Sequence, residues 1–295
     1  MGVMMLRHFR MISLAFTALA CSQVVEAQLT TTLTLSKIQY VAGEPVVAVV
    51  TVTNHAGRSL TFASDGRTQW LDFMVQDRQS APVPLRGKKI FGKMTIKAGE
   101  TLAREVDLAQ CFQLSEPGNF SVSAVVHMPG EALDGSTTNR VLFTQSTGVR
   151  SWNQKVGLPG RPGNIRDYRL LNFNNGDKSQ IYAQVVNVQT GQKVRTFLLG
   201  DVLLLRKPLA TVDNQQRMHV LFLATPTMWV HCQVNTDGKL VAREIHQRGE
   251  QGDPQLQNFN DGSVHVMNSV IYDPKVAAEA KARIRKASDR PAANY

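Results

Sequence analysis

Three histidines in the second half of the chain have side chains that could hold a metal ion. His219, His231 and His265 each lie between apolar residues of a predicted strand. A hairpin that turns at residues 225–227 places His219 and His231 on the same face as diagonal neighbours. If His265 lay alongside, three imidazoles would bind Zn²⁺ and leave a fourth position open. That arrangement is the chemistry of a metal-dependent hydrolase.

A second interpretation treats these residues as half-exposed strand histidines. We favour it from the sequence, because nothing in the pattern fixes which strands are neighbours, and we accordingly expect no cofactor. The opposite face of the same hairpin is predicted to be core, which accounts for Cys232 without any chemistry. The residues on that predicted core face are Met218, Val220, Phe222, Val230, Cys232 and Val234.

The sequence carries no familiar catalytic motif. The sequence contains no His-Glu-x-x-His, Gly-x-Ser-x-Gly, Walker loop or Cys-x-x-Cys pattern. Its carboxylates are scattered and indicate no pair of the kind that glycosidases use. The sequence therefore leans against an enzyme.

The elements that must position these side chains are predicted to be strands in two domains. Residues 29–147 form short alternating segments separated by turns, and in Phe120–Met128 apolar and polar residues alternate along the strand. Residues 164–272 continue in the same way, with a strong hairpin turn at residues 235–238 and a predicted strand at Val202–Arg206. The fold class that follows is all-β.

Parts of the first domain resemble bacterial immunoglobulin-like domains. Gly43-Glu44-Pro45-Val46, Val50–Asn54 and Leu60–Phe62 are similar to their opening hairpin. Glu116–Val122 is similar to the entry of their penultimate strand, with Phe120 where a tyrosine corner often stands. The resemblance implies an immunoglobulin-like β-sandwich over 29–147. It implies little about function, because such sandwiches serve adhesion, inhibition and spacing alike.

The second domain faintly resembles β-propeller blades. Leu171–Gly176, Leu209–Asn214 and Leu256–Gly262 look alike and recur roughly every 40 residues. A closed propeller needs at least about four blades, and the chain has room for under three. We expect an open assembly of blade-like antiparallel hairpins; the alternative is that several copies complete a ring.

Two further segments flank the second domain. Residues 148–163 are predicted to be a linker, because Gly157–Gly163 is rich in glycine and proline. Residues 273–295 are predicted to form a basic C-terminal helix and tail, with Asp273 and Pro274 as its cap and first turn. The helix is expected to be solvated; contact with an anionic surface is the alternative.

The N-terminal residues 1–27 have the pattern of a signal peptide. Arg7 and Arg10 precede an apolar run, Met11–Cys21, and a small residue, Ala27, ends the segment. A lipobox-like reading makes Cys21 a lipid anchor instead. No segment is apolar enough over about 20 residues to span a bilayer. The sequence thus predicts export to the periplasm, the cell envelope or the medium.

Charge and cysteine usage limit the partners. The formal charge is +10 and the pI about 9.7, which favours acidic partners, but the positive residues are spread along the chain. We expect a protein or anionic polymer as partner and no nucleic acid. Cys111 and Cys232 fall in different halves of the chain. A disulfide between them is one alternative; we favour the interpretation that each is a small buried hydrophobic residue.

The function that these observations favour is a non-catalytic secreted or envelope-associated protein that contacts its partners through β surfaces. Two alternatives remain. One is a peptidase inhibitor, which the immunoglobulin-like resemblance suggests. The other is the metal-dependent hydrolase that His219, His231 and His265 would form.

Overall fold

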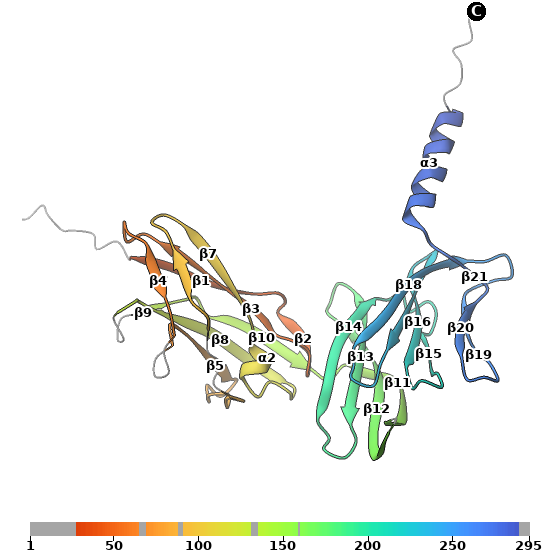
Figure 1. Cartoon of the computed structure of the whole chain (residues 1–295), viewed down its shortest axis with the longest axis horizontal. Helices are drawn as coiled ribbons and strands as arrows, with labels where there is room; N and C mark the ends of the chain where they lie inside the picture. The colour runs from red at the N-terminus through yellow and green to blue at the C-terminus, as the bar shows by residue number, and fades with distance from the viewer. Residues whose placement is uncertain (1–27, 65–68, 88–90, 131–134, 159, 289–295) are drawn as a thin grey trace, which may run out of the picture.

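The computed structural model describes residues 28–64, 69–87, 91–130, 135–158 and 160–288, and folds most of them into two β-sandwich lobes (Figure 1). The all-β class predicted from the sequence, with antiparallel sheets and a short C-terminal helix, is confirmed. The predicted signal peptide and Cys21 lie outside the described residues. Within the described part, no helix is long and apolar enough to cross a membrane.

The first lobe consists of two main sheets. One has the order β1–β3–β7, with strands at Leu29–Leu35, Val47–Asn54 and Thr101–Asp107. The other has the order β2–β10–β8–β5, with strands at Gln39–Val41, Val141–Ser146, Gly118–His127 and Leu71–Asp77. Short strand β9 (Gly135–Thr137) pairs with β8, and β4 (Leu60–Phe62) pairs with β6 (Met94–Ile96). Helix α2 (Leu108–Cys111) follows β7 and is capped by Asp107.

Strand alternation builds the core of this first sandwich. Val50 and Val52 of β3 point inward and are fully buried, and so are Val122 and Ala124 of β8. Their neighbours in sequence lie on the other face, because successive side chains of a strand point to opposite sides, and all but the buried Ser121 are partly exposed. The alternation predicted for Phe120–Met128 is therefore confirmed.

The second lobe also consists of two main antiparallel sheets, in which neighbouring strands are consecutive along the chain, except for the last pair of the second sheet. The first sheet contains β11 (Val149–Leu158), β12 (Arg161–Asn174), β13 (Ser179–Asn187) and β14 (Lys193–Asp201). The second contains β15 (Leu209–Val212), β16 (Met218–Thr225), β17 (Met228–Val234), β18 (Leu240–Arg248) and β21 (Ser269–Ile271). A separate hairpin pairs β19 (Gln255–Asn258) with β20 (Val264–Met267).

These two sheets pack against each other through one apolar core. All six residues of the predicted core face on β16 and β17 belong to it, which confirms that part of the pattern reading. They meet Leu170, Ile181 and Ala183 of the opposite sheet. Cys232 lies in this core, whereas Cys111 lies in the core of the first sandwich, so both cysteines are buried as expected.

Two local expectations were wrong. Residues 149–158 and 161–163, expected within the linker, belong to β11 and β12, and the glycines and proline mark the tip of their hairpin. Pro162 is tolerated because β12 pairs with β13 only from Arg166 onward. Residues 202–206 carry no strand; they cross from one sheet to the other, with Val202 buried and Leu205 exposed.

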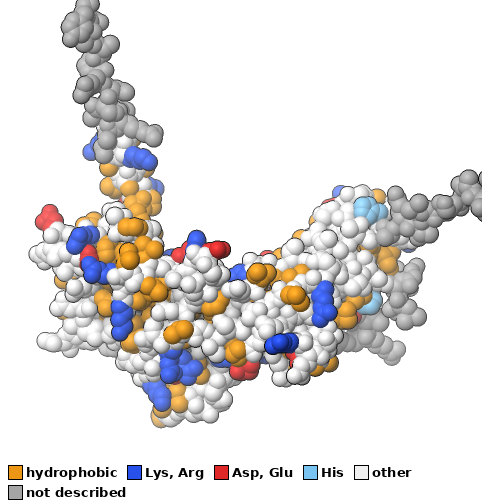
Figure 2. Space-filling view, turned by 180° about the vertical axis from the view of Figure 1, so that it is seen from behind, with side chains coloured by type: hydrophobic (Ala, Val, Ile, Leu, Met, Phe, Trp, Pro, Cys, Tyr) orange, Lys and Arg blue, Asp and Glu red, His pale blue; other side chains and the backbone are white. Residues whose placement is uncertain are grey.

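The C-terminal helix α3 (Pro274–Ser288) projects away from the second lobe (Figure 1). Asp273 caps it as predicted, since its carboxylate accepts a hydrogen bond from the Lys275 backbone N–H at 2.8 Å. On the face drawn in Figure 2, Lys and Arg side chains are scattered over both lobes, in keeping with charge that is spread along the chain.

The two lobes meet at a small apolar contact. Val41 of the first lobe is fully buried against Leu171 and Tyr182 of the second. Beside it, the Lys37 ammonium lies 2.7 Å from the Glu44 carboxylate and donates to the Tyr182 hydroxyl at 3.2 Å. Burial raises the pKa of Glu44, although hydrogen bonds from Lys37 oppose that shift. The connection from β10 to β11 is only two residues long, and Lys193 of the second lobe also pairs with Glu116 of the first, so the Val41 contact is one of several that orient the lobes.

We predict that Val41→Asp separates the lobes without unfolding them. A carboxylate at this site would lose its hydration between Leu171 and Tyr182, which is unfavourable without a partner. Small-angle scattering is expected to show a larger radius of gyration, while the far-UV circular dichroism stays unchanged. Ile38→Asp, at a position 66% exposed on the same lobe, is the control. An unchanged radius of gyration in Val41→Asp would contradict the prediction.

Candidate metal centre

The antiparallel pairing of β16 and β17 brings two of the predicted histidines into contact. His219 is opposite Gln233 and His231 is opposite Leu221, so the two imidazoles are diagonal neighbours on one face. His219 Nδ1 and His231 Nε2 lie 3.0 Å apart. The expectation that these residues are half-exposed was wrong: they are 1% and 3% exposed.

The β19–β20 hairpin explains this burial. Leu256 of β19 and Val266 of β20 pack on the same face of the β16–β17 hairpin, against Leu221, Leu223 and Trp229. A sheet face that the sequence suggested was partly wet is therefore covered by a later segment of the chain.

The third predicted histidine, His265, lies on that covering hairpin. Its neighbours Val264 and Val266 are the more buried residues of β20, and His265 itself is exposed and lies against Phe259. Side chains alternate along a strand, so His265 lies on the opposite face of β20 from Val266. The structure does not bring it into the group of ligand atoms around His231.

Two residues of β18 take its place. Glu244 is directly opposite His231, and His246 follows two positions later on the same face. One ligand atom each of His231, Glu244 and His246 lies within 4.8 Å of the other two. His231 Nδ1 is 3.3 Å from Glu244 Oε2, and His246 Nε2 is 3.5 Å from the same oxygen. The sequence signal for this pair is the spacing Glu-x-His in a strand, which places both side chains on one face and belongs to none of the catalytic motifs named above.

A carboxylate from the end of β15 completes the other side of the cluster. Asp213 Oδ2 lies 3.1 Å from His219 Nε2 and 2.7 Å from the Arg217 guanidinium. Burial alone would raise the pKa of Asp213, but hydrogen bonds from Arg217 and His219 outweigh it and lower that pKa. Asp213 is therefore ionised at neutral pH and accepts the Nε2–H proton of His219.

This fixes the protons along the chain of contacts. With Nε2–H of His219 given to Asp213, His219 Nδ1 is an acceptor and takes the Nε2–H of His231. His231 Nδ1 then carries a lone pair and faces the Glu244 carboxylate, so two hydrogen-bond acceptors lie opposite each other. Burial lowers the pKa of His231 to about 4, so the imidazole does not bind a second proton at neutral pH.

The last histidine of the cluster, His246, has a buried nitrogen that faces the Glu244 carboxylate. His246 Nδ1 lies 3.0 Å from the Ser269 hydroxyl, and that hydroxyl donates to the Val266 carbonyl at 3.5 Å. His246 Nδ1 is thus the donor, and Nε2 carries the lone pair. Within the described residues, Nε2 is buried, and the Glu244 carboxylate 3.5 Å away lies at the limit of hydrogen-bond distance.

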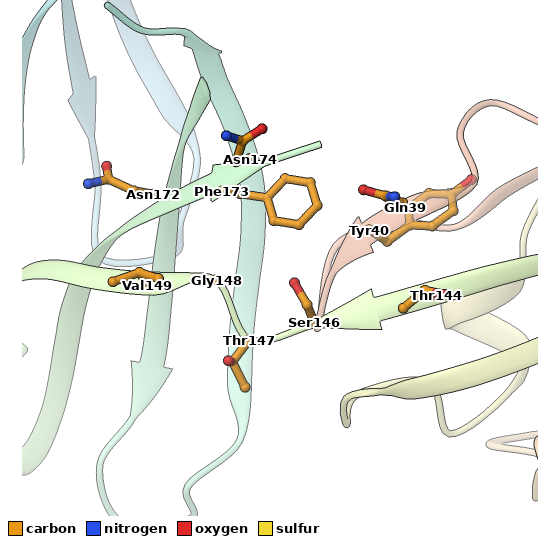
Figure 3. Close-up of a pocket in the computed structure, with 10 residues that line it drawn as sticks. All are labelled: Gln39, Tyr40, Thr144, Ser146, Thr147, Gly148, Val149, Asn172, Phe173 and Asn174. Atoms are coloured by element: carbon orange, nitrogen blue, oxygen red, sulfur yellow. The ribbon is translucent and has the colours of Figure 1, made fainter. Parts of the chain in front are cut away.

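A second candidate region is a pocket between the lobes. It has a volume of about 460 Å³ and lies at the connection of β10 to β11. Phe173 points across it toward Gln39 and Tyr40, and the other lining side chains are mostly amides and hydroxyls (Figure 3). It brings together no charged or metal-binding side chains, so the histidine cluster is the stronger site.

Comparison with known proteins adds little to this geometry. No family model matches the chain, and no curated protein matches it. Among solved structures, it is similar to the sporulation control protein Spo0M from Bacillus subtilis, with 12% identity over 59% of this chain and 91% of that chain. The TM-score is 0.28, too low to bear on fold or function here.

We predict that Asp213→Ala destabilises the second sandwich. The substitution leaves the His219 ring and the Arg217 guanidinium without their shared acceptor. The expected loss in the free energy of unfolding is about 3 kcal/mol, at the low end for a broken buried pair because Arg217 is partly exposed. Urea denaturation measures it, with the exposed turn residue Asp177→Ala as the control. Equal stability of the two variants would contradict the account.

Proposed function

We propose that this chain is an exported, non-catalytic binding protein of the cell envelope, and that its second sandwich binds a divalent transition-metal ion through His231, Glu244 and His246. The observation that carries the metal site is that one ligand atom each of His231, Glu244 and His246 lies within 4.8 Å of the other two, with the buried Nε2 of His246 3.5 Å from Glu244 Oε2. The predicted signal peptide and the immunoglobulin-like pattern of the first sandwich support the rest.

The distances from the Glu244 oxygen to the two imidazole nitrogens suit a zinc ion. Two ligands about 2.0–2.1 Å from a tetrahedral zinc lie roughly 3.3 Å apart. The contacts of Glu244 Oε2 with His231 Nδ1 and His246 Nε2 measure 3.3 and 3.5 Å. A cation between them also resolves the facing acceptors, because it accepts lone pairs from both imidazoles and from the carboxylate.

The groups behind the ligands support the same assignment. A metal-binding histidine normally donates its other N–H to a fixed acceptor, which sets the tautomer. His231 donates to His219, which Asp213 and Arg217 hold in place. His246 donates to Ser269. Every N–H of the two ligand imidazoles is thus used, and both lone pairs are directed toward Glu244.

A metal-dependent hydrolase is the second candidate, since three protein ligands leave one tetrahedral position open. Such an enzyme needs a further group to move protons. The carboxylate that contacts the cluster from its other side, Asp213, is held by His219 and Arg217. Binding is therefore the better-supported function, and turnover of an ester or peptide by the zinc-loaded protein would overturn it.

We predict that the purified, untagged protein binds one Zn²⁺ per chain and that His246→Gln abolishes this binding. Loss of a direct ligand should weaken affinity by more than the roughly 10–100-fold typical of losing an outer partner. Isothermal titration calorimetry gives the affinity, and elemental analysis gives the stoichiometry. The melting temperature should rise with zinc in the wild type and stay constant in the variant.

Two histidine variants serve as controls for that experiment. His127→Gln removes another histidine–carboxylate contact, with Asp72 at 3.1 Å, which has no third ligand in the described part of the chain. His265→Gln removes the residue that the sequence pattern suggested. Both are expected to keep zinc binding. Zinc binding by His246→Gln, or its loss in His265→Gln, would reject the proposed ligand set.

The outer contact gives a graded prediction. His219→Gln should leave the three ligands in place but remove the ring that fixes His231. Zinc affinity is expected to fall by about 10–100-fold without a change in stoichiometry. Unchanged affinity in titration calorimetry would show that His219 does not orient the ligand.

A further inference from the structure

A cavity of about 640 Å³ lies on the same sheet face as the histidine cluster, beside it and without sharing a ligand residue. Leu221, Leu223 and Trp229 line it from the sheet. Loop residues before β15 and between β18 and β19 form its rim. The volume is in the range of sites that hold small organic molecules.

The floor of this cavity is apolar. Leu221 and Leu223 from β16 and Trp229 from β17 form one buried cluster with Leu203 and Leu256 packed against it. These side chains are at most 7% exposed, so the floor is firm but offers only a small apolar surface; Leu209, which also lines the cavity and is 40% exposed, offers more. An apolar group that entered the cavity would lose its hydration against this base, which favours binding.

The rim of the cavity is positively charged. Arg206, Lys207 and Arg248 line it, and Asp253 is the one acidic residue among its lining residues, which gives a net charge of +2. Asp253 lies 3.1 Å from the Arg206 guanidinium and 3.0 Å from that of Arg248. The side chains of Arg206 and Arg248 remain 66% and 64% exposed. Each therefore keeps free N–H groups that could donate hydrogen bonds to a second carboxylate or to a phosphate.

The edge of the cavity beyond the end of β18 is held by the backbone. The Gly249 N–H donates to the Asn268 carbonyl at 3.0 Å, and Gly249 forms a bridge with Gly252. A Cβ on Gly249 would lie 2.9 Å from the Asn268 backbone, so this close approach needs a glycine. This part of the rim is thus shaped before any ligand arrives, which lowers the entropic cost of binding.

We propose that this cavity binds a small amphipathic anion: an acyl or aryl group on Trp229 and the two leucines, with a carboxylate or phosphate at Arg206, Lys207 and Arg248. The adjoining loop suits such a ligand, because Leu204 and Leu205 are 54% and 78% exposed immediately before Arg206. A longer chain that leaves the cavity would meet these leucines. The site is separate from the metal centre and does not depend on it.

The test is displacement of the fluorescent anion 1-anilinonaphthalene-8-sulfonate from the full-length protein. Decanoate and decyl phosphate are expected to displace it, and the uncharged decanol is expected to be at least about tenfold weaker. The two anions distinguish a carboxylate from a phosphate ligand. The measurement is repeated after treatment with a chelator, and the same affinities are expected, so failure of the metal proposal leaves this one standing.

Exposed-residue variants keep the test independent of folding. Arg206→Gln/Lys207→Gln should weaken decanoate by about tenfold or more, whereas Arg78→Gln/Lys97→Gln, at exposed positions of the first sandwich, should have no effect. Equal binding of decanol and decanoate would overturn the proposal. So would equal loss in both double variants, or no displacement by either anion.

Discussion

The second sandwich depends on the strict alternation of β16 and β17. One face of this hairpin carries the apolar side chains of the central core, and the other carries His219 and His231. Because the pairing register is set by burying the apolar face, the two imidazoles must lie together on the reverse face. A slip of one residue would put the imidazoles in the core.

Burial of that reverse face then imposes a second requirement. The β19–β20 hairpin covers it with Leu256 and Val266, so the histidines lose water and need fixed partners. Asp213 and Ser269 supply partners at the two ends of the cluster. In the middle, the lone pairs of His231 and His246 face the Glu244 carboxylate, an arrangement that a cation stabilises and a third acceptor does not.

The sequence was sufficient to predict which residues of β16 and β17 share a face, but not which later segment of the chain covers that face. The core face of β16 and β17 could be predicted because a period of two and a short turn determine it locally. The covering hairpin could not, since its contact with the sheet is long-range and it turned His219 and His231 from half-exposed into buried residues. The same lack of long-range information explains why His265 was grouped with them. It does lie on a strand, but its side chain is on the exposed face of that strand.

The glycine-rich segment 157–163 illustrates a second limit. Glycine and proline mark a chain reversal, but they do not distinguish a hairpin tip from a linker, and here they form a tip. Likewise, Glu244 and His246 belong to no familiar motif, and only the register of β17 with β18 places them against His231.

The central claim is that His231, Glu244 and His246 bind one metal ion. Anomalous diffraction at the zinc edge from crystals grown with zinc tests it most directly: one peak between His231 Nδ1, Glu244 and His246 Nε2 is predicted, and a peak at His265, or none at this site, would contradict it.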